Sequence, residues 1–179
     1  MLSKLKQLLL LFRYLRLKLD KRIHLNGFVS MCPNVRILLE KESKLVLGRG
    51  CRLKPGTVIY VKKGASLIIG DNTSTGHDTE ISVGKYVTIG SDVIMAPYTY
   101  ITDSNHRFDL QDKTIREQGM DIGTVEIGND VWIARGSMVL KDARIGNRTV
   151  IAAGAIVSKS FPDRVIIGGI PAKILKELR

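Results

Sequence analysis

The hydrophobic positions of this chain recur with a period of six residues over much of its length. An α-helix repeats every 3.6 residues and a β-strand every two, so neither element alone produces this spacing. In residues 125–159 the period holds at six consecutive β-branched positions: Ile127, Ile133, Val139, Ile145, Ile151 and Val157. A fixed period in a sequence indicates stacked structural repeats.

Six residues are enough for one short strand and one tight corner. The β-branched residue of the strand would point inward, and the glycine that often follows it would permit unusual backbone dihedrals at the corner. Three such sides close a triangular coil of about 18 residues, and successive coils stack by parallel hydrogen bonding. A β-sandwich would instead show two-residue alternation and irregular turn spacing. We therefore predict an all-β fold, a three-sided parallel β-helix over residues 46–170. Before residue 125 the same six-residue spacing recurs in three shorter blocks: Leu47, Leu53 and Ile59; Ile69, Thr75 and Ile81; and Val83, Ile89, Met95 and Ile101.

Residues 1–22 have a different pattern, which predicts one amphipathic helix with basic flanks. Such a helix could pack on its own domain or on a neighbouring subunit, or it could lie on an anionic membrane surface. Residues 23–45 mix apolar and polar positions, and we expect a transition segment there. The apolar face of the helix is formed by Leu5, Leu8, Leu9, Phe12, Leu15 and Leu19.

The period breaks once, between residues 102 and 124. This segment is rich in charged residues and contains His106. An excursion from an otherwise regular solenoid usually marks the binding face.

The net charge of +11 favours anionic partners such as acidic lipid or a phosphorylated ligand. Nucleic acid is disfavoured, because the chain lacks zinc-finger spacings, an RNA-binding aromatic motif and a helix-turn-helix pattern. Cys32 and Cys51 have no metal-binding or redox spacing, so we expect reduced, structural thiols. No run resembles a cleaved secretory signal, and the longest apolar run is too short to span a bilayer. We therefore expect a cytoplasmic protein, peripheral on the inner face of the membrane if the helix binds lipid.

Several motifs resemble the hexapeptide-repeat acyltransferases. They are the histidine-bearing loop DSNHRFD, followed by IGNDVWI, IAAGAIVSK and GGIPAKILKEL. The strongest likeness is to maltose and galactoside acetyltransferases and to polysaccharide O-acetyltransferases, and it covers roughly residues 65–179. The resemblance implies a left-handed coil, a homotrimer with active sites between adjacent prisms, and a short helix over residues 171–179.

The resemblance also implies transfer of an acetyl group from acetyl-CoA, with His106 as the general base. An imidazole can take the proton from an acceptor hydroxyl as that hydroxyl attacks the thioester, so transfer is expected to be direct, in a ternary complex. Asp78 stands where the sugar acetyltransferases carry an asparagine that contacts the acceptor, and His77 lies beside it. Asp103 could hold the imidazole tautomer, although a turn-forming aspartate is an equal alternative.

Coenzyme A is expected to lie along the groove between prisms. Lysines replace two of the family's arginines near the nucleotide phosphates, and lysine offers a point charge without bidentate geometry. The positions that match the family's cofactor contacts are Trp132, Ala134, Arg135, Ala153, Ser158, Lys159, Lys173 and Lys176.

Three other functions are compatible with parts of this pattern. The γ-class carbonic anhydrases share the coil but need three histidines at fixed spacing, whereas His24, His77 and His106 are widely spread, so no metal is expected. A non-enzymatic scaffold would not require a histidine in the one excursion loop. An N-acetyltransferase of an amino sugar or amino acid remains an alternative. We predict an O-acetyltransferase that acts on a sugar, a polysaccharide or a lipid-linked saccharide precursor.

Overall fold

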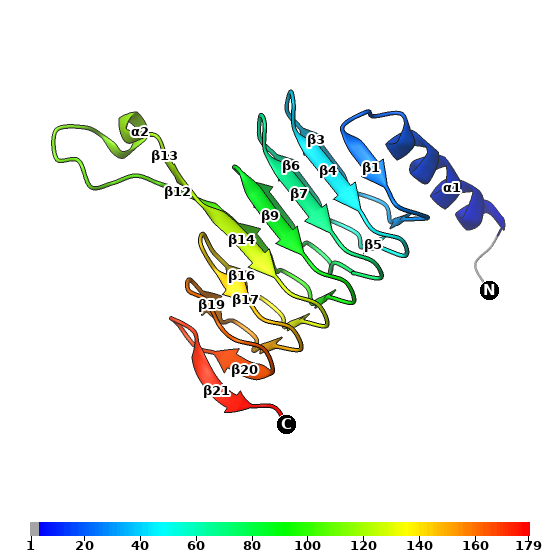
Figure 1. Ribbon diagram of the computed structural model, residues 1–179. Helices are drawn as coiled ribbons and strands as arrows, with labels where there is room; N and C mark the ends of the chain where they lie inside the picture. Colours follow the sequence, from blue (N-terminus) through cyan, green and yellow to red (C-terminus); the bar gives the residue numbers. More distant parts are fainter. Residues whose placement is uncertain (1–3) are drawn as a thin grey trace.

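The computed structural model describes residues 4–179, and side chains from residue 8 on. The chain winds into a left-handed parallel β-helix with three flat sides, a helix at its N-terminal end and one arm that leaves the coil (Figure 1). The predicted fold class is confirmed.

Each side of the prism is a stack of short parallel strands. Face I contains β1 (Ile23–Leu25), β4 (Lys44–Leu47), β7 (Ser66–Ile69), β9 (Tyr86–Ile89), β14 (Thr124–Ile127) and β17 (Arg144–Ile145). Face II contains β2 (Ser30–Met31), β5 (Arg52–Leu53), β10 (Ile94–Met95), β15 (Trp132–Ile133), β18 (Val150–Ile151) and β20 (Val165–Gly168). Face III contains β3 (Arg36–Leu39), β6 (Val58–Val61), β8 (Glu80–Val83), β11 (Tyr100–Thr102), β16 (Met138–Val139) and β19 (Ile156–Val157).

The residues that recur with the six-residue period form the interior of the prism. Ile127 pairs in register with Ile145, and Ile133 with Ile151, so one coil takes three hexapeptides in this region. Every apolar position of the predicted blocks is buried, and so is Thr75. Stacked β-branched side chains thus form one continuous apolar column, which stabilises the parallel strands by burial.

The glycines that follow the buried residues have a different role from the expected one. None of Gly48, Gly70, Gly128 or Gly146 has a positive φ. A Cβ on Gly70 would lie 2.6 Å from the backbone nitrogen of Ser91, so the stacked corners approach too closely for a side chain. The left-handed corner conformation is taken instead by polar residues such as Asn72, Asp92, Asp130, Arg148 and Arg164, with φ between 54° and 59°.

The β-helix begins earlier than predicted. The segment 23–45, expected as a transition, supplies β1, β2 and β3, which pair in register with β4, β5 and β6. The first coils are longer than three hexapeptides, because Leu45 pairs with Leu67 and Leu67 pairs in turn with Val87. The six-residue phase therefore drifts in the first coils, and the sequence pattern does not extend into them.

The predicted N-terminal helix is present as α1 (Lys4–Lys18), across the N-terminal end of the prism (Figure 1). Residues 1–3 and the Leu5 side chain lie outside the described part. Leu17 is the buried anchor of α1, and Tyr14 packs on the core. No helix in residues 4–179 has the length and apolar content needed to cross a membrane.

The expected C-terminal helix over residues 171–179 is wrong. The chain turns back at Gly168 and Gly169 and forms a strand, β21 (Lys173–Glu177), antiparallel to β20. The last coil leaves the edge of face II unpaired, and pairing that edge satisfies backbone groups that a helix would leave open. Pairing with β20 thus determines the conformation of the last segment, in place of the helix implied by the resemblance.

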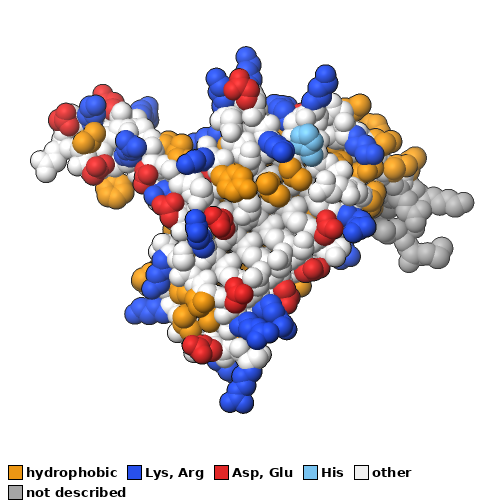
Figure 2. Space-filling model, in the orientation of Figure 1, with side chains coloured by type: hydrophobic (Ala, Val, Ile, Leu, Met, Phe, Trp, Pro, Cys, Tyr) orange, Lys and Arg blue, Asp and Glu red, His pale blue; other side chains and the backbone are white. Residues whose placement is uncertain are grey.

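The predicted excursion is an arm, residues 103–123. It consists of an antiparallel ribbon of β12 (Ser104–His106) and β13 (Met120–Ile122), with the short helix α2 (Ile115–Gln118) at its far end. Figures 1 and 2 show the arm standing away from the prism. Its base lies at the edge between faces III and I.

Candidate active site

His106 is the last residue of β12 and is exposed on the arm. Its strand partner is Met120, so the ribbon fixes the backbone that carries the imidazole. The hollow beside it is lined by arm residues: Asn105, Arg107, Phe108, Asp109 and Asp121. An exposed imidazole on a hydrogen-bonded ribbon is available to a reactant that approaches from outside the chain.

Asp103 anchors the base of the arm instead of contacting the imidazole. It is fully buried, and its carboxylate accepts backbone hydrogen bonds from Gly84 (2.6 Å), Lys85 (2.8 Å) and Tyr86 (2.8 Å). Its own carbonyl accepts a hydrogen bond from Gly123 N, which closes the arm. Both carboxylate oxygens are engaged by the 84–86 corner, which favours the structural alternative for Asp103 over an orienting contact with His106.

Lys141 ties the arm to the next coil. Its ammonium lies 3.0 Å from Asp121 on β13 and 2.6 Å from Asp142 at the corner. The hydrogen bonds to Asp142 and Asp121 raise the pKa of Lys141, and the same contact with Lys141 lowers the pKa of Asp142. The two ion pairs of Lys141, together with the hydrogen bonds of Asp103, fix the direction in which the arm leaves the prism.

A second group of predicted residues lies on the edge between faces II and III. His77 and Asp78 form one of its corners, where Asp78 has φ of 53°. Both are exposed, and they line an open groove with Arg36 and Gly56. In the single chain this groove and the hollow beside His106 are lined by different residues, so His77 and Asp78 share no cavity with His106.

The same edge continues through the next coils. Backbone hydrogen bonds join corner to corner, from Tyr98 N to His77 O, from Gly136 N to Pro97 O and from Gly154 N to Arg135 O. The guanidinium of Arg135 stacks over the exposed ring of Tyr98, 4.8 Å from its centroid. Arg135 and Ala153, predicted to contact the cofactor, are thus stacked one coil apart on one exposed edge.

Tyr98 was missed by the sequence analysis, because it is far from Arg135 along the chain. Ala134 differs from its exposed neighbours: its side chain is buried, and it forms the floor of the edge. Only a backbone group of Ala134 could meet a ligand there.

The remaining predicted contacts occupy other parts of the prism. Ser158 and Lys159 follow β19 at the edge between faces III and I, on the same side as the base of the arm. Lys159 lies over the ring of Phe161, 5.5 Å from its centroid. Lys173 and Lys176 are exposed on β21, at the end of face II.

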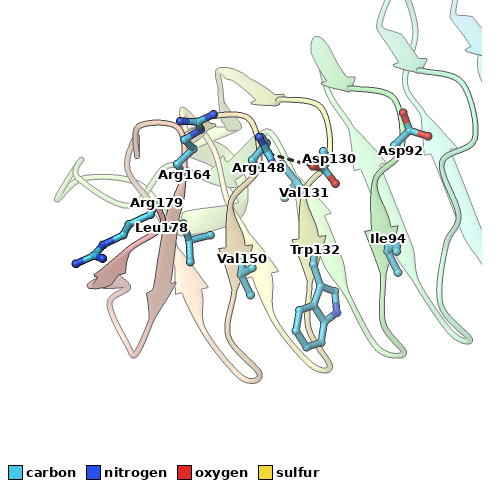
Figure 3. Close-up of a pocket in the computed structure, with 10 residues that line it drawn as sticks. All are labelled: Asp92, Ile94, Asp130, Val131, Trp132, Arg148, Val150, Arg164, Leu178 and Arg179. Carbon is cyan, nitrogen blue, oxygen red and sulfur yellow. Dashed lines mark ion pairs between the residues drawn. The ribbon is translucent and has the colours of Figure 1, made fainter.

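Trp132 stands on face II in an open groove of about 380 Å³ (Figure 3). Its indole is 51% exposed and lies in register between Ile94 and Val150, which gives the groove an apolar strip. Arg148 and Arg164 line the opposite margin, and Arg148 pairs with Asp130 at 3.5 Å. The two arginines were not singled out from the sequence, since only the coil register brings them beside Trp132.

The thiol of Cys51 is not available as a nucleophile. Cys51 is buried, and burial raises the pKa of its thiol to about 11, so it stays protonated at neutral pH. This agrees with the structural role expected for Cys51.

Comparisons with known proteins agree with this geometry. Residues 124–159 match the family model of the bacterial transferase hexapeptide, six repeats. The "Probable acetyltransferase Rv3034c" of Mycobacterium tuberculosis is 35% identical over 92% of this chain, which spans 55% of the length of that relative. WbbJ of Escherichia coli K12, whose name assigns it to lipopolysaccharide biosynthesis as an O-acetyl transferase, is 30% identical over 90% of this chain and 93% of its own length.

A solved structure supports the same grouping. The hexapeptide-repeat acetyltransferase VCA0836 of Vibrio cholerae, crystallised with acetyl coenzyme A, superposes with a TM-score of 0.66 at 26% identity and covers 78% of this chain and 72% of its own. The coil, the histidine-bearing arm and these relatives lead to one conclusion: the chain belongs to the hexapeptide-repeat acetyltransferases.

Proposed function

We propose that this enzyme transfers an acetyl group from acetyl-CoA to a hydroxyl of a saccharide, with His106 as general base. The observation that carries the proposal is an exposed imidazole on an arm fixed at its base by Asp103 and Lys141. The name of the WbbJ relative, which covers nearly the whole chain, favours oxygen over nitrogen as the acceptor atom.

The proposed chemistry is direct transfer. The imidazole of His106 takes the proton of the acceptor hydroxyl while that oxygen attacks the thioester carbonyl. The tetrahedral adduct then expels the coenzyme A thiolate, which receives the proton, and the products are an acetyl ester and free coenzyme A. No covalent acyl-enzyme is formed, and the described thiol of Cys51 is not used.

The donor would lie along the edge between faces II and III. Arg135 stacks on Tyr98, and Ala153 has only a small side chain. Together they leave the surface of this edge open to a ligand. Lys173 and Lys176 would hold phosphates as point charges. Ser158 and Lys159 lie at the other edge of face III, so a donor that meets both groups would require two copies of the chain.

The proposed active unit is therefore a homotrimer with sites between adjacent prisms. The arm supports this, because Phe108, Leu110 and Ile115 are exposed on it and would be covered by a neighbouring prism. His106 of one copy would then meet the edge between faces II and III of the next copy.

The acceptor would bind near His77 and Asp78, which line the groove on that edge. The carboxylate of Asp78 can accept hydrogen bonds from sugar hydroxyls, where the family's asparagine could also donate one. We propose a cytoplasmic reaction, with a free or lipid-linked saccharide as acceptor.

The experiment is thiol release from acetyl-CoA with a panel of saccharides. Changing His106→Ala should lower kcat about 10²- to 10⁴-fold, whereas His24→Ala, at an exposed histidine of face I, should leave it unchanged. The product should lose its acetyl group to alkaline hydroxylamine, as an ester does and an amide does not. Equal turnover without the His106 imidazole would contradict the assignment of the base, and a hydroxylamine-stable product would indicate N-acetylation.

A further inference from the structure

The helix α1 has apolar side chains on two opposite sides. Leu17 and Tyr14 face the first coils. Leu8, Phe12, Leu15 and Leu19 are exposed by 64%, 66%, 50% and 82%. At about 100° per residue these four fall within a narrow arc centred almost opposite Leu17.

The exposed apolar stripe is therefore more than a consequence of packing. A helix that serves only to cap the prism needs one apolar side, which Leu17 and its neighbours supply. Leu9 and Leu11 are also exposed, and they lie at the two margins of the outer stripe, about 90° and 70° from its centre. Contiguous exposed apolar surface of this kind marks an interaction site.

Cations border the stripe on both sides. Arg16 and Lys18 are exposed and lie about 90° and 70°, on opposite sides, from the line midway between Leu8 and Leu15. Lys21, just beyond the helix, is also exposed, whereas Arg22 is engaged by Asp20 at 2.6 Å. The helix has no acidic residue in its sequence between Lys4 and Lys18. An apolar stripe with cationic margins is the pattern of a helix that lies in the interface of an anionic membrane.

The position of α1 in the fold suits a flat surface. The helix lies across the end of the prism (Figure 1), and Figure 2 shows hydrophobic side chains gathered at that end of the molecule. Phe28 is exposed beside α1, on the side of the helix that faces the coils, with its ring centroid 5.1 Å from that of Tyr14.

We infer that α1 docks this protein on an anionic lipid bilayer, with its outer stripe in the headgroup region. A second copy of the chain is the competing occupant. Two copies of the same stripe would bring Arg16 and Lys18 of both close together, and like charges oppose that contact. Acidic headgroups instead neutralise them. The inference does not depend on the proposed acetyl transfer, but it would keep the enzyme beside a lipid-linked acceptor.

The test is sedimentation of the full chain with vesicles of phosphatidylcholine, alone or mixed with phosphatidylglycerol. The chain should sediment with the mixed vesicles and be released by high salt, because the cations contribute to binding. The double change Phe12→Ser and Leu15→Ser should lower the bound fraction about tenfold or more. Ile170→Ser removes a comparably exposed apolar side chain, 73% exposed, near the C-terminal end of the prism and should leave binding unchanged.

The charge margin is tested by Arg16→Glu with Lys18→Glu, which should abolish the preference for phosphatidylglycerol. Lys62→Glu with Lys63→Glu reverses the same number of charges on another corner of the prism, and it should leave the preference for phosphatidylglycerol unchanged. Thermal unfolding of each variant distinguishes lost binding from lost fold. The inference is overturned if the unaltered chain does not sediment with the mixed vesicles, or if the Phe12 and Leu15 variant binds them as well as the unaltered chain does. A change of oligomeric mass in that variant, without vesicle binding by the unaltered chain, would assign the stripe to a second copy.

Discussion

The stacked coils and the arm use hydrophobic side chains in opposite ways. In the coils every sixth residue is buried, and each corner is hydrogen-bonded to the coils on either side. On the arm, Phe108 is 76% exposed, and Leu110 and Ile115 are exposed with it. The core of the prism is therefore formed within one chain, whereas the exposed apolar side chains of the arm are open to the neighbouring copy proposed above. If this contrast is correct, changes in the prism should act on stability and changes in the arm on catalysis.

The largest expected effect is that of His106→Ala on turnover. Loss of a general base should lower kcat about 10²- to 10⁴-fold. The melting temperature should stay within about 1 °C, because an exposed side chain contributes little to stability. Steady-state kinetics and calorimetry on the same preparation check both. A large loss of stability would show that the arm is part of the folded core.

Within the prism, Ile133→Ala should act in the opposite manner. Ile133 is fully buried, so its truncation leaves a cavity and should lower the free energy of unfolding by about 2–5 kcal/mol. Ile94→Ala on the neighbouring strand is the control, since that side chain is 58% exposed, and its cost should be below about 0.5 kcal/mol. Chemical denaturation measures both, and similar costs at the two positions would contradict the burial.

Asp103→Asn addresses the junction between the two regions. The amide keeps the shape but replaces a carboxylate that accepts three backbone hydrogen bonds, so a cost of about 1–3 kcal/mol is expected. Faster hydrogen exchange should be concentrated in residues 84–86 and in the base of β12 and β13. Asp109→Asn, on an exposed part of the arm, is the control. Unchanged exchange at the junction would refute the anchoring role.

The smallest effect should come from the C-terminal strand. Lys173→Ala with Lys176→Ala should raise the KM for acetyl-CoA about three- to tenfold and leave kcat nearly unchanged, since exposed point charges contribute modestly to phosphate binding. Lys62→Ala with Lys63→Ala is the matched control. A KM that does not change would remove these two lysines from the donor site.

The sequence predicted the interior of the prism well, because one buried β-branched residue per side imposes the six-residue period. It did not predict the first coils, where longer corners between Leu45, Leu67 and Val87 shift the phase. The helix that the resemblance implied for residues 171–179 does not form, because the segment pairs with β20.

The candidate site could be proposed only in part from the sequence. Motifs singled out His106, Arg135 and Ala153, whose roles stay predictions. The stacking of Arg135 on Tyr98, and the place of Arg148 beside Trp132, depend on coil register and join residues far apart in sequence. The role of Asp103 depends on backbone amides that no sequence pattern specifies.

In the proposed trimer, the arm of one copy supplies His106 to a donor groove on another. The direct test mixes two inactive chains, His106→Ala with an intact groove and Ala153→Trp with an intact arm, by unfolding and reassembling them together. In randomly mixed trimers about a quarter of the junctions would pair an intact arm with an intact groove, so about a quarter of the original activity should return. If native mass spectrometry shows mixed assemblies and no activity returns, the arm and the groove of the same chain form the site. That result would contradict the proposed sharing of the site between copies.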